Sequence, residues 1–279
     1  MFTINCKGKI VNLSEPVLMG IINATPDSFY QGHLTEGNDA MLAIAGRMIG
    51  EGATILDIGG QSTRPGSVRI SADEELSRVI PVISSIHQKF PEAIISIDTY
   101  YSAVANAAVA EGASIVNDIS AGNMDDAMLA NVAALGVPYI CMHMQGKPDT
   151  MQQEPVYDNV VREVLDFFIN KTEQCKRAGI KDIIIDPGFG FGKTIEHNFS
   201  LLKGLSVLSI LNTPILAGLS RKSTIYKTLN VTVDEALNGT TVLNTMALLN
   251  GASILRVHDV HAAKEAVLLY TAYKKAPQN

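Results

Sequence analysis

A polar side chain closes each of eight short apolar runs along this 279-residue chain. These residues are Asn23, Asp57, Asp98, Asn117 with Asp118, His143, Asp186, Ser220 with Arg221 and Lys222, and Arg256 with His258. Carboxylates, amides and cations brought to one place would bind a small planar ligand with donors and acceptors on several edges, and an anion beside it. Asp, Asn and Ser also favour helix N-caps, so each alone has an equally good structural explanation. Together, the eight predict a polar ligand site.

Two loops rich in Gly, Pro, Ser and Thr follow the first two apolar runs. They read NATPDSFYQGHLTEG (23–37) and GGQSTRPGSVRIS (59–71), and both exceed the ~2–6 residues usual between a strand and a helix. The second contains Ser62, Thr63 and Arg64, whose hydroxyls and guanidinium suit phosphate oxygens. A solvated turn is the alternative. Long loops beside an active site often act as lids, and we expect both loops to do so.

A repeated pattern predicts the elements that position these residues. Helix ends containing Gly precede the apolar runs, as in EGATILDIGG from Glu51 and NGASILRVHDV from Asn250. Continuous apolar runs are typical of parallel strands buried on both faces. Strands are predicted to begin near residues 18, 54, 94, 115, 138, 182, 214 and 253, and helices to include 38–52, 73–90, 156–179 and 234–251.

This alternation predicts an α/β fold, a (β/α)8 TIM barrel. We expect a single domain over residues 1–279 with a short lead-in at 1–16. An open doubly wound sheet is the alternative. In a barrel the active site lies at the carboxyl ends of the strands, where the polar residues stand.

Two motifs resemble sites that the residues do not complete. GFGFGKT (188–194) resembles a phosphate-binding P-loop, but Pro187 stands where that motif requires Gly, six residues before Lys193. We interpret the segment as a flexible loop that presents Phe189 and Phe191. His258 and His261 lie at helical spacing, but no cluster of carboxylates and histidines accompanies them. No structural zinc site is expected.

Composition and charge argue against several classes of partner. The formal net charge is −6 with scattered Lys and Arg, so no nucleic-acid surface is expected. No apolar run approaches the ~20 residues of a membrane span, and the opening MFTINCKGKIVNL lacks a secretion signal. Cys6, Cys141 and Cys175 form no CxxC pair and are expected to be buried thiols of a cytoplasmic protein.

At the two long loops the sequence resembles the dihydropteroate synthase family of pterin-binding enzymes. MGIINATPDSF (19–29) and DIGGQSTRPGS (57–67) are similar to the first two family signatures. Further matches follow in order over nearly the whole chain: SIDT, VNDIS, MHMQG, DPGFGFGK, GLSRKS and RVHDV. The resemblance implies a homodimer that joins 6-hydroxymethyl-dihydropterin pyrophosphate to p-aminobenzoate and releases pyrophosphate with the help of Mg²⁺. It also implies that the protein is a target of sulfonamides, which mimic p-aminobenzoate.

The resemblance also implies roles for residues at matching positions. Those implied to bind the pterin are Asp98, Asn117, Met142, Asp186, Phe191, Lys222 and Arg256. Those implied at p-aminobenzoate are Phe29, Thr63, Pro65, Ser220 and Lys222. Those implied at pyrophosphate are Asn23, Thr63, Arg64, Arg256 and His258, with Asn23 also at the metal. Ser220 would begin a candidate helix, SRKSTIYKTL, whose amides favour an anion.

We expect a dissociative mechanism. Catalysis would rest on Asp98, Lys222, Arg256 and His258, the last three stabilising the departing pyrophosphate together with Mg²⁺. The ring would delocalise the resulting methylene cation, which the aniline nitrogen attacks. Two departures from the family pattern affect the expected geometry of the p-aminobenzoate pocket: Tyr30-Gln31-Gly32-His33 in place of Ser-Asp-Gly-Gly, and Gln61 in place of Glu.

Two other functions remain possible at this point. A corrinoid-dependent methyltransferase that binds methyltetrahydrofolate would share the pterin residues, but it has no need of a loop such as STRPG. A noncatalytic pterin-binding barrel would keep the fold, although retention of Asn23, Arg64, Lys222 and Arg256 argues against it. Helix 234–251 could form a dimer interface or simply pack on the barrel.

Overall fold

The chain folds as a ring of eight parallel strands. The computed structural model describes residues 2–25, 34–61, 69–146, 151 and 155–277. The barrel strands are β3 (Val17–Asn23), β4 (Ile55–Gly59), β5 (Ile94–Asp98), β6 (Ile115–Asp118), β7 (Tyr139–Met142), β8 (Ile183–Asp186), β9 (Leu216–Ala217) and β10 (Ile254–Val257). Their spatial order is β8-β7-β6-β5-β4-β3-β10-β9, and a parallel bridge between Ile185 and Ile215 joins the two ends. The barrel prediction is confirmed, and the open-sheet alternative is wrong.

Alternate residues of each strand point into the barrel. At the amino-terminal level the inward residues are apolar, and they form part of one buried cluster: Met19, Ile55, Ile94, Ile115, Ile140, Ile184, Leu216 and Ile254. Residues between the inward positions, such as Leu56, Ile95 and Leu255, belong to the core shared with the helices. One period further along each strand lies the level at which polar side chains enter the barrel.

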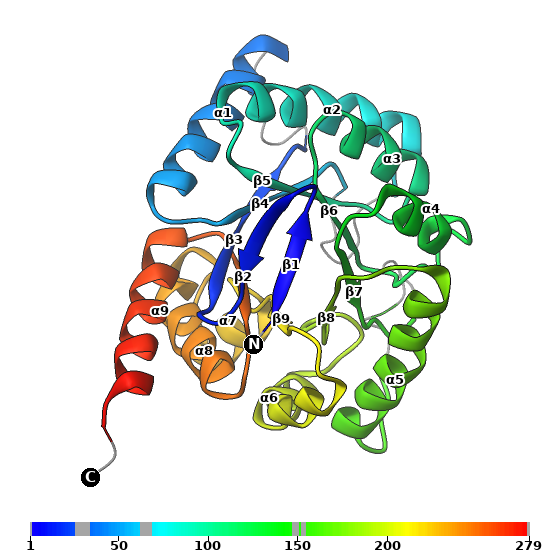
Figure 1. Ribbon diagram of the computed structural model, residues 1–279. Coiled ribbons are helices and arrows are strands. Elements are labelled where there is room, and N and C mark those ends of the chain that lie inside the picture. The colour runs from blue at the N-terminus through cyan, green and yellow to red at the C-terminus, as the bar shows by residue number, and fades with distance from the viewer. Residues whose placement is uncertain (1, 26–33, 62–68, 147–150, 152–154, 278–279) are drawn as a thin grey trace.

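Helices surround the strands (Figure 1). They are α1 (Leu34–Gly50), α2 (Ala72–Lys89), α3 (Ser102–Ala110), α4 (Met128–Leu135), α5 (Val160–Ala178), α6 (Ile195–Lys203), α7 (Ser223–Leu229), α8 (Leu237–Leu249) and α9 (Val260–Lys275). Local capping explains their bounds. The Ser71 side chain accepts a hydrogen bond from the Glu74 amide at the start of α2, and Gly179, with φ 100°, ends α5.

The predicted helices are present with shifted ends. The helix predicted at 73–90 lies at 72–89, but the one predicted from 156 starts at Val160, because Asn159 caps it by accepting from the Arg162 amide. Helix 234–251 is divided into a 3-10 turn (Asp234–Ala236) and α8. The helix predicted from 38 begins at residue 34.

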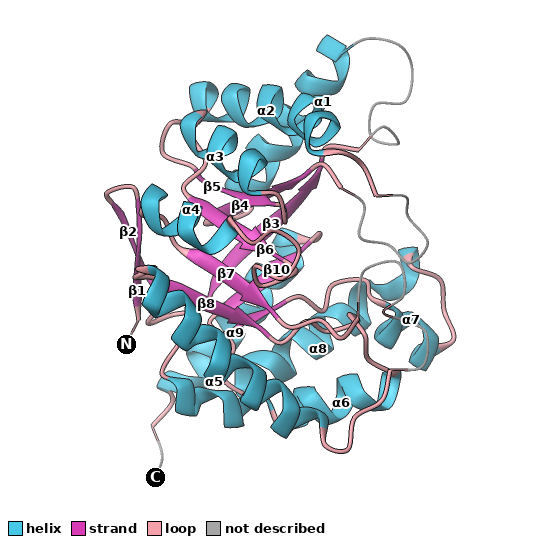
Figure 2. Cartoon of the chain, turned by 90° about the vertical axis from the view of Figure 1, so that its right-hand side faces the viewer, coloured by secondary structure: helices cyan, strands magenta, loops and turns pink. Residues whose placement is uncertain are grey.

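The lead-in forms an antiparallel hairpin, β1 (Thr3–Cys6) with β2 (Lys9–Asn12). Its inward residues Ile4, Cys6 and Val11 are buried in the same cluster as the apolar level of the barrel. Figure 2 shows the hairpin at one end of the barrel and α7 towards the other. The hairpin therefore closes the amino-terminal end and leaves the carboxyl end to the polar residues.

The cysteines lie where expected. Cys6, Cys141 and Cys175 are buried free thiols, which confirms that they are buried and unpaired. No helix in the described ranges is both long enough and apolar enough to cross a bilayer.

Candidate active site

Polar side chains meet inside the upper level of the barrel. Asp57, Asn117, Asp186 and Arg256 each stand two residues after an apolar residue of the lower level. The strand period of two therefore aims all four inward. Arg256 and Asp57 are 199 positions apart in sequence, yet they form a direct hydrogen bond. The expected meeting of polar residues at the carboxyl ends is confirmed for this set.

Arg256 binds two carboxylates. Its Nε donates to Oδ2 of Asp57 and its Nη2 to Oδ2 of Asp98, each at 2.6 Å. Asn117 Nδ2 donates to the same Asp57 oxygen at 3.0 Å. Burial raises the pKa of Asp98 to about 7 against the opposing charge of Arg256. Burial alone would lower the pKa of Arg256, but the Asp57 and Asp98 carboxylates hold it above its ordinary value.

Asp186 and Lys222 lie beside the backbone of Gly218, which has no side chain to separate them from a ligand. A Cβ at position 218 would stand 3.7 Å from Lys222 Nζ, 3.8 Å from Asp186 Oδ2 and 4.0 Å from the Cβ of Arg256. Burial raises the pKa of Asp186 while Lys222 opposes that rise. Desolvation lowers the pKa of Lys222 to about 8, so its ammonium predominates at neutral pH. A ligand can thus reach a carboxylate acceptor and an ammonium donor side by side.

An apolar wall borders the polar groups. Tyr100, Ile119 and Met142 form a buried cluster, and Phe191 packs against it. The Nζ of Lys222 lies 4.7 Å from the centre of the Phe191 ring, within cation–π distance. The predicted proximity of Met142 and Phe191 to the polar residues holds, and the wall suits one face of a flat ring.

Asn23, Ser220 and His258 stand at the ends of their strands. Asn23 is exposed, and its carboxamide makes no hydrogen bond within the described ranges. Ser220 Oγ accepts from the His258 amide at 3.2 Å and lies 3.0 Å from His258 Nδ1. Desolvation lowers the pKa of His258 to about 4, and the positive charge of Arg256 acts in the same direction. His258 is therefore a neutral hydrogen-bonding group at pH 7 rather than a cation.

The expectation that Ser220 begins a helix is wrong. Helix α7 begins at Ser223 with Lys222 at its N-cap, and Arg221 has a φ of 54°. This left-handed residue turns the chain between the strand and the helix. Ser220 is instead a buried hydroxyl bonded to His258, so the helix end does not supply it with an anion site.

Two other residues at strand ends serve the scaffold. Asp118 follows the inward-facing Asn117 and points to the opposite face, where it accepts from the Ser120 and Gly122 amides and from the Tyr139 hydroxyl, each at 2.7 Å. Arg221 pairs with Asp259 through two contacts of 2.8 Å. Neither group is free to face a ligand.

The interpretation of 188–194 as a flexible loop presenting Phe189 and Phe191 is wrong for Phe189 and holds only for Phe191. The Phe189 side chain is fully buried in the main core, whereas Phe191 is only partly buried. Asn198 Oδ1 accepts from the Gly190 amide at 2.7 Å, and the Tyr157 hydroxyl donates to the Gly192 carbonyl at 2.8 Å. The segment is fastened from both sides.

Several predicted residues lie outside the described ranges: Phe29, Thr63, Arg64 and Pro65, together with Tyr30, Gln31, Gly32 and His33. The departure at Gln61 is described. Its Oε1 accepts from the Ile70 amide at 2.9 Å and from the Tyr100 hydroxyl at 3.3 Å. Gln61 thus links the two ends of its loop to the end of β5.

Among the described residues, Asn23 has the chemistry of a Mg²⁺ ligand. The described residues contain no group of three or more His, Cys, Asp or Glu that could hold a metal ion. Mg²⁺ usually keeps several waters and takes few protein ligands. The exposed carboxamide of Asn23, which has an oxygen to offer at the end of β3, fits such a role.

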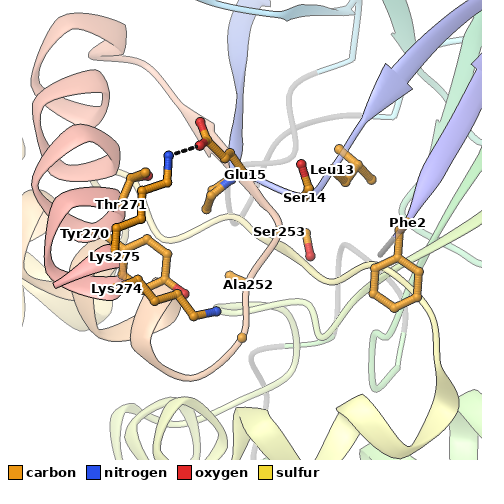
Figure 3. Close-up of a pocket in the computed structure, with 12 residues that line it drawn as sticks. Phe2, Leu13, Ser14, Glu15, Ala252, Ser253, Tyr270, Thr271, Lys274 and Lys275 are labelled. Atoms are coloured by element: carbon orange, nitrogen blue, oxygen red, sulfur yellow. Dashed lines mark hydrogen bonds and ion pairs between the residues drawn. The ribbon is translucent and has the colours of Figure 1, made fainter. Parts of the chain in front are cut away.

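A separate cavity of about 380 Å³ lies at the opposite end of the barrel. Figure 3 shows Glu15 paired with Lys275 on its wall, with Phe2 and Tyr270 nearby. Barrel enzymes act at the carboxyl ends of their strands, so this cavity is not the candidate active site.

Sequence reasoning gave no role to four residues of the site: Asp57, Tyr100, Ile119 and Gly218. Asp57 was recognised only as a strand end, although it holds both Arg256 and Asn117. Tyr100, Ile119 and Gly218 were not singled out. A glycine in the apolar run TPILAGLS is a signal of close ligand approach, whereas nothing local marks Ile119 as a wall residue.

The chain and its structure are similar to proteins of known activity. Residues 19–258 match the family model described as "Pterin binding enzyme". The chain is 44% identical to dihydropteroate synthase from Escherichia coli (strain K12), over 98% of this chain and 97% of that protein. Yersinia pestis dihydropteroate synthase in a sulfonamide drug complex has a TM-score of 0.93 and 40% identity, covering 99% of this chain and 100% of that one. Xanthomonas albilineans dihydropteroate synthase in complex with 7,8-dihydropteroate has a TM-score of 0.89 and 38% identity, covering 99% of this chain and 100% of that one.

These similarities extend over nearly the full length and include the strands that carry the polar residues. They favour the synthase over the methyltransferase. The chain belongs to the pterin-binding enzymes and, among them, to the dihydropteroate synthase family.

Proposed function

We propose that this protein joins 6-hydroxymethyl-7,8-dihydropterin pyrophosphate to p-aminobenzoate, giving 7,8-dihydropteroate and pyrophosphate for folate biosynthesis. The observation that supports this function best is one juxtaposition. Asp186, Lys222 and Arg256 lie beside Gly218, and an apolar wall flanks these groups. The full-length similarity to dihydropteroate synthases agrees with this reading.

The pterin is the ligand that this arrangement fits. Its aminopyrimidinone edge presents adjacent N–H donors, which Asp186 Oδ2 can accept, while Lys222 can donate to the carbonyl side. Asp98 and Asn117 belong to the network on Arg256 and would serve the remaining ring atoms. A ring lacking these groups would leave buried polar atoms unpaired, which strongly disfavours its binding.

Electrostatics then favours loss of pyrophosphate. Lys222 and Arg256 would place positive charge beside a pterin bound at Asp186, and neutral His258 could donate a hydrogen bond. The C–O bond breaks with its electron pair leaving on pyrophosphate, and the ring nitrogens delocalise the methylene cation. When bound, Mg²⁺ would neutralise charge on the pyrophosphate, with Asn23 as its protein ligand. Asp57, Asp98 and Asp186 offset much of the positive charge of Arg256 and Lys222. Mg²⁺ and Arg64 would therefore supply the further positive charge that the departing pyrophosphate needs.

The amine substrate would react after the C–O bond has broken. The neutral aniline nitrogen attacks the cation, and one proton then leaves that nitrogen. Its pocket would include Phe29, Thr63, Pro65 and Ser220 with Lys222 at the border. Ser220 is described, and its hydroxyl lies beside His258. A sulfonamide is expected to occupy this pocket in place of p-aminobenzoate.

A homodimer is part of the proposal. On α8, Val242, Met246 and Leu249 are 45%, 44% and 57% exposed, and their spacing places them on one stripe. Leu268 and Leu269 on the neighbouring α9 are also exposed. An apolar surface of this kind suits burial against a second copy. We also propose a cytoplasmic location, which the three free thiols support.

The direct test is incubation of the purified protein with both substrates and Mg²⁺. Dihydropteroate should form, and a sulfonamide should inhibit competitively with p-aminobenzoate. Tight pterin binding without product would instead identify a noncatalytic pterin-binding barrel. Transfer of a methyl group from methyltetrahydrofolate would identify a methyltransferase.

A further inference from the structure

Lys193 is a buried lysine to which the reaction above gives no role. Only 3% of it is exposed. Its Nζ donates to the carbonyl oxygens of Gly188 and Phe191 at 3.0 and 3.1 Å and lies 2.9 Å from Nδ1 of His143. An ammonium has three N–H donors and no acceptor. The three neighbours therefore satisfy it completely, which offsets the cost of burying its charge.

The ammonium lies within the turn that follows β8. The Phe191 amide donates to the Gly188 carbonyl at 3.1 Å, so Lys193 and this turn share one acceptor. Gly188 has a φ of 67°, and a Cβ there would come within 1.9 Å of the His143 carbonyl oxygen. The turn therefore packs closely against the backbone of His143, the residue that follows β7. Lys193 also hydrogen-bonds the turn to the His143 side chain.

The same turn contacts both charged groups of the pterin subsite. The Gly188 amide donates to Asp186 Oδ1 at 2.7 Å. The Phe189 carbonyl accepts from Lys222, and the Phe191 ring lies under the same ammonium. A shift of the turn would therefore displace the donor at Lys222 and reorient the acceptor at Asp186.

We propose that Lys193 and His143 are positioning residues for the pterin subsite, an inference that rests on the proposed function. The Lys193 ammonium holds the turn 188–191 closed against the imidazole of His143 and so sets the places of Lys222 and Asp186. His143 must accept at Nδ1, which requires a neutral ring with its proton on Nε2.

The surroundings of the pair agree with these charge states. Rings of Phe167 and Tyr157 pack on His143, with centroids 4.9 and 6.2 Å away. Burial, followed by the charge of Lys193, lowers the pKa of His143 to about 3. Burial lowers the pKa of Lys193 to about 7, while Asp186 raises it and Lys222 lowers it. At slightly acidic pH the ring is neutral and the lysine is charged.

Calorimetric titration with 6-hydroxymethylpterin at slightly acidic pH tests the role. Lys193→Met should weaken binding about 10- to 100-fold, because it removes hydrogen bonds to a charged group. Lys203→Met, on the exposed last turn of α6, is the matched control and should bind as the unmodified protein does. Unchanged affinity in a folded Lys193→Met protein would overturn the proposal.

His143 variants separate positioning from general packing. His143→Asn keeps an acceptor at the δ position and should retain affinity, whereas His143→Leu should lose it. Since both residues act through one contact, Lys193→Met combined with His143→Leu should weaken binding by less than the product of the single effects. Equal losses in the Asn and Leu variants would overturn the acceptor role of His143.

Nitrogen NMR of the unmodified protein gives a readout that does not depend on activity. The His143 ring should remain neutral with its proton on Nε2 from mildly acidic to neutral pH. A protonated ring or a proton on Nδ1 would overturn the proposed contact. If the unmodified protein shows the expected tautomer but binds no pterin, the proposed function fails while the Lys193–His143 contact stands.

Discussion

Nε of Arg256 lies 2.6 Å from Oδ2 of Asp57, and both groups sit inside the barrel between β10 and β4. The Asp57 side chain is fully buried, and that of Arg256 is 20% exposed. The pair thus fixes a guanidinium in the middle of the site before any ligand arrives.

Asp57→Asn should destabilise the protein and weaken pterin binding. It removes the charge from a buried pair, so the free energy of unfolding should fall by about 2 kcal/mol, with Asp98 still bound to Arg256. Urea unfolding measures the change. Asp166→Asn, which removes an exposed partner of Arg162, should alter it by no more than about 0.5 kcal/mol. Similar losses in the two variants would contradict the importance of the buried pair.

Lys222→Ala should weaken pterin binding. The variant removes the ammonium beside Asp186 and the contact with Phe191, so the pterin Kd should rise about 10- to 100-fold in calorimetry. Lys227→Ala, on the exposed end of the same helix, should leave the Kd unchanged. A Lys222→Ala protein with normal pterin affinity would refute the assigned role.

Glu75→Gln should change how stability depends on pH. Glu75 is buried on α2, where Thr99 donates to one of its oxygens at 3.0 Å and the other has no partner in the described structure. Burial raises its pKa from 4.5 to about 8. The folded state therefore holds a proton that the unfolded state loses, and stability declines as pH rises from about 4.5 to about 8.

The Gln variant cannot lose this stability, since it has no proton to release. Its advantage over the unmodified protein should grow through that pH window to the order of a few kcal/mol. Urea midpoints at acidic and alkaline pH measure it, with Glu92→Gln as an exposed control. A difference that does not vary with pH would mean that Glu75 ionises normally.

Met246→Glu should convert the proposed homodimer into a monomer. The charge would fall within the exposed stripe of Val242, Met246 and Leu249 on α8, where burial against a second copy would leave it unpaired. Sedimentation velocity reports the mass. Ala103→Glu, at an exposed position of α3, should leave the dimer intact. Dimers in both variants would place the interface elsewhere.

Much of the fold was predictable, since each barrel strand begins within two residues of an apolar run's expected start. The direction of polar residues was harder to assign. Asn117 and Asp118 are adjacent in sequence but face opposite sides of β6, and only alternation from the inward-facing Ile115 separates them. Ser220 was misplaced because the left-handed Arg221, which delays α7, leaves no signature in the sequence.

Long-range partners were not predictable from motifs. Nothing in the sequence near Lys193 reveals that its partner is His143, 50 positions earlier. The same is true of Arg256 and Asp57, which only the closed ring of strands brings together.

The most direct measurement of the central claim is the yield of both products from one reaction mixture. With pterin pyrophosphate, p-aminobenzoate and Mg²⁺, the protein should form dihydropteroate and pyrophosphate in equal amounts, and Lys222→Ala should slow both together. Pyrophosphate release without dihydropteroate, or no release despite pterin binding, would contradict the assignment of this site to the synthase reaction.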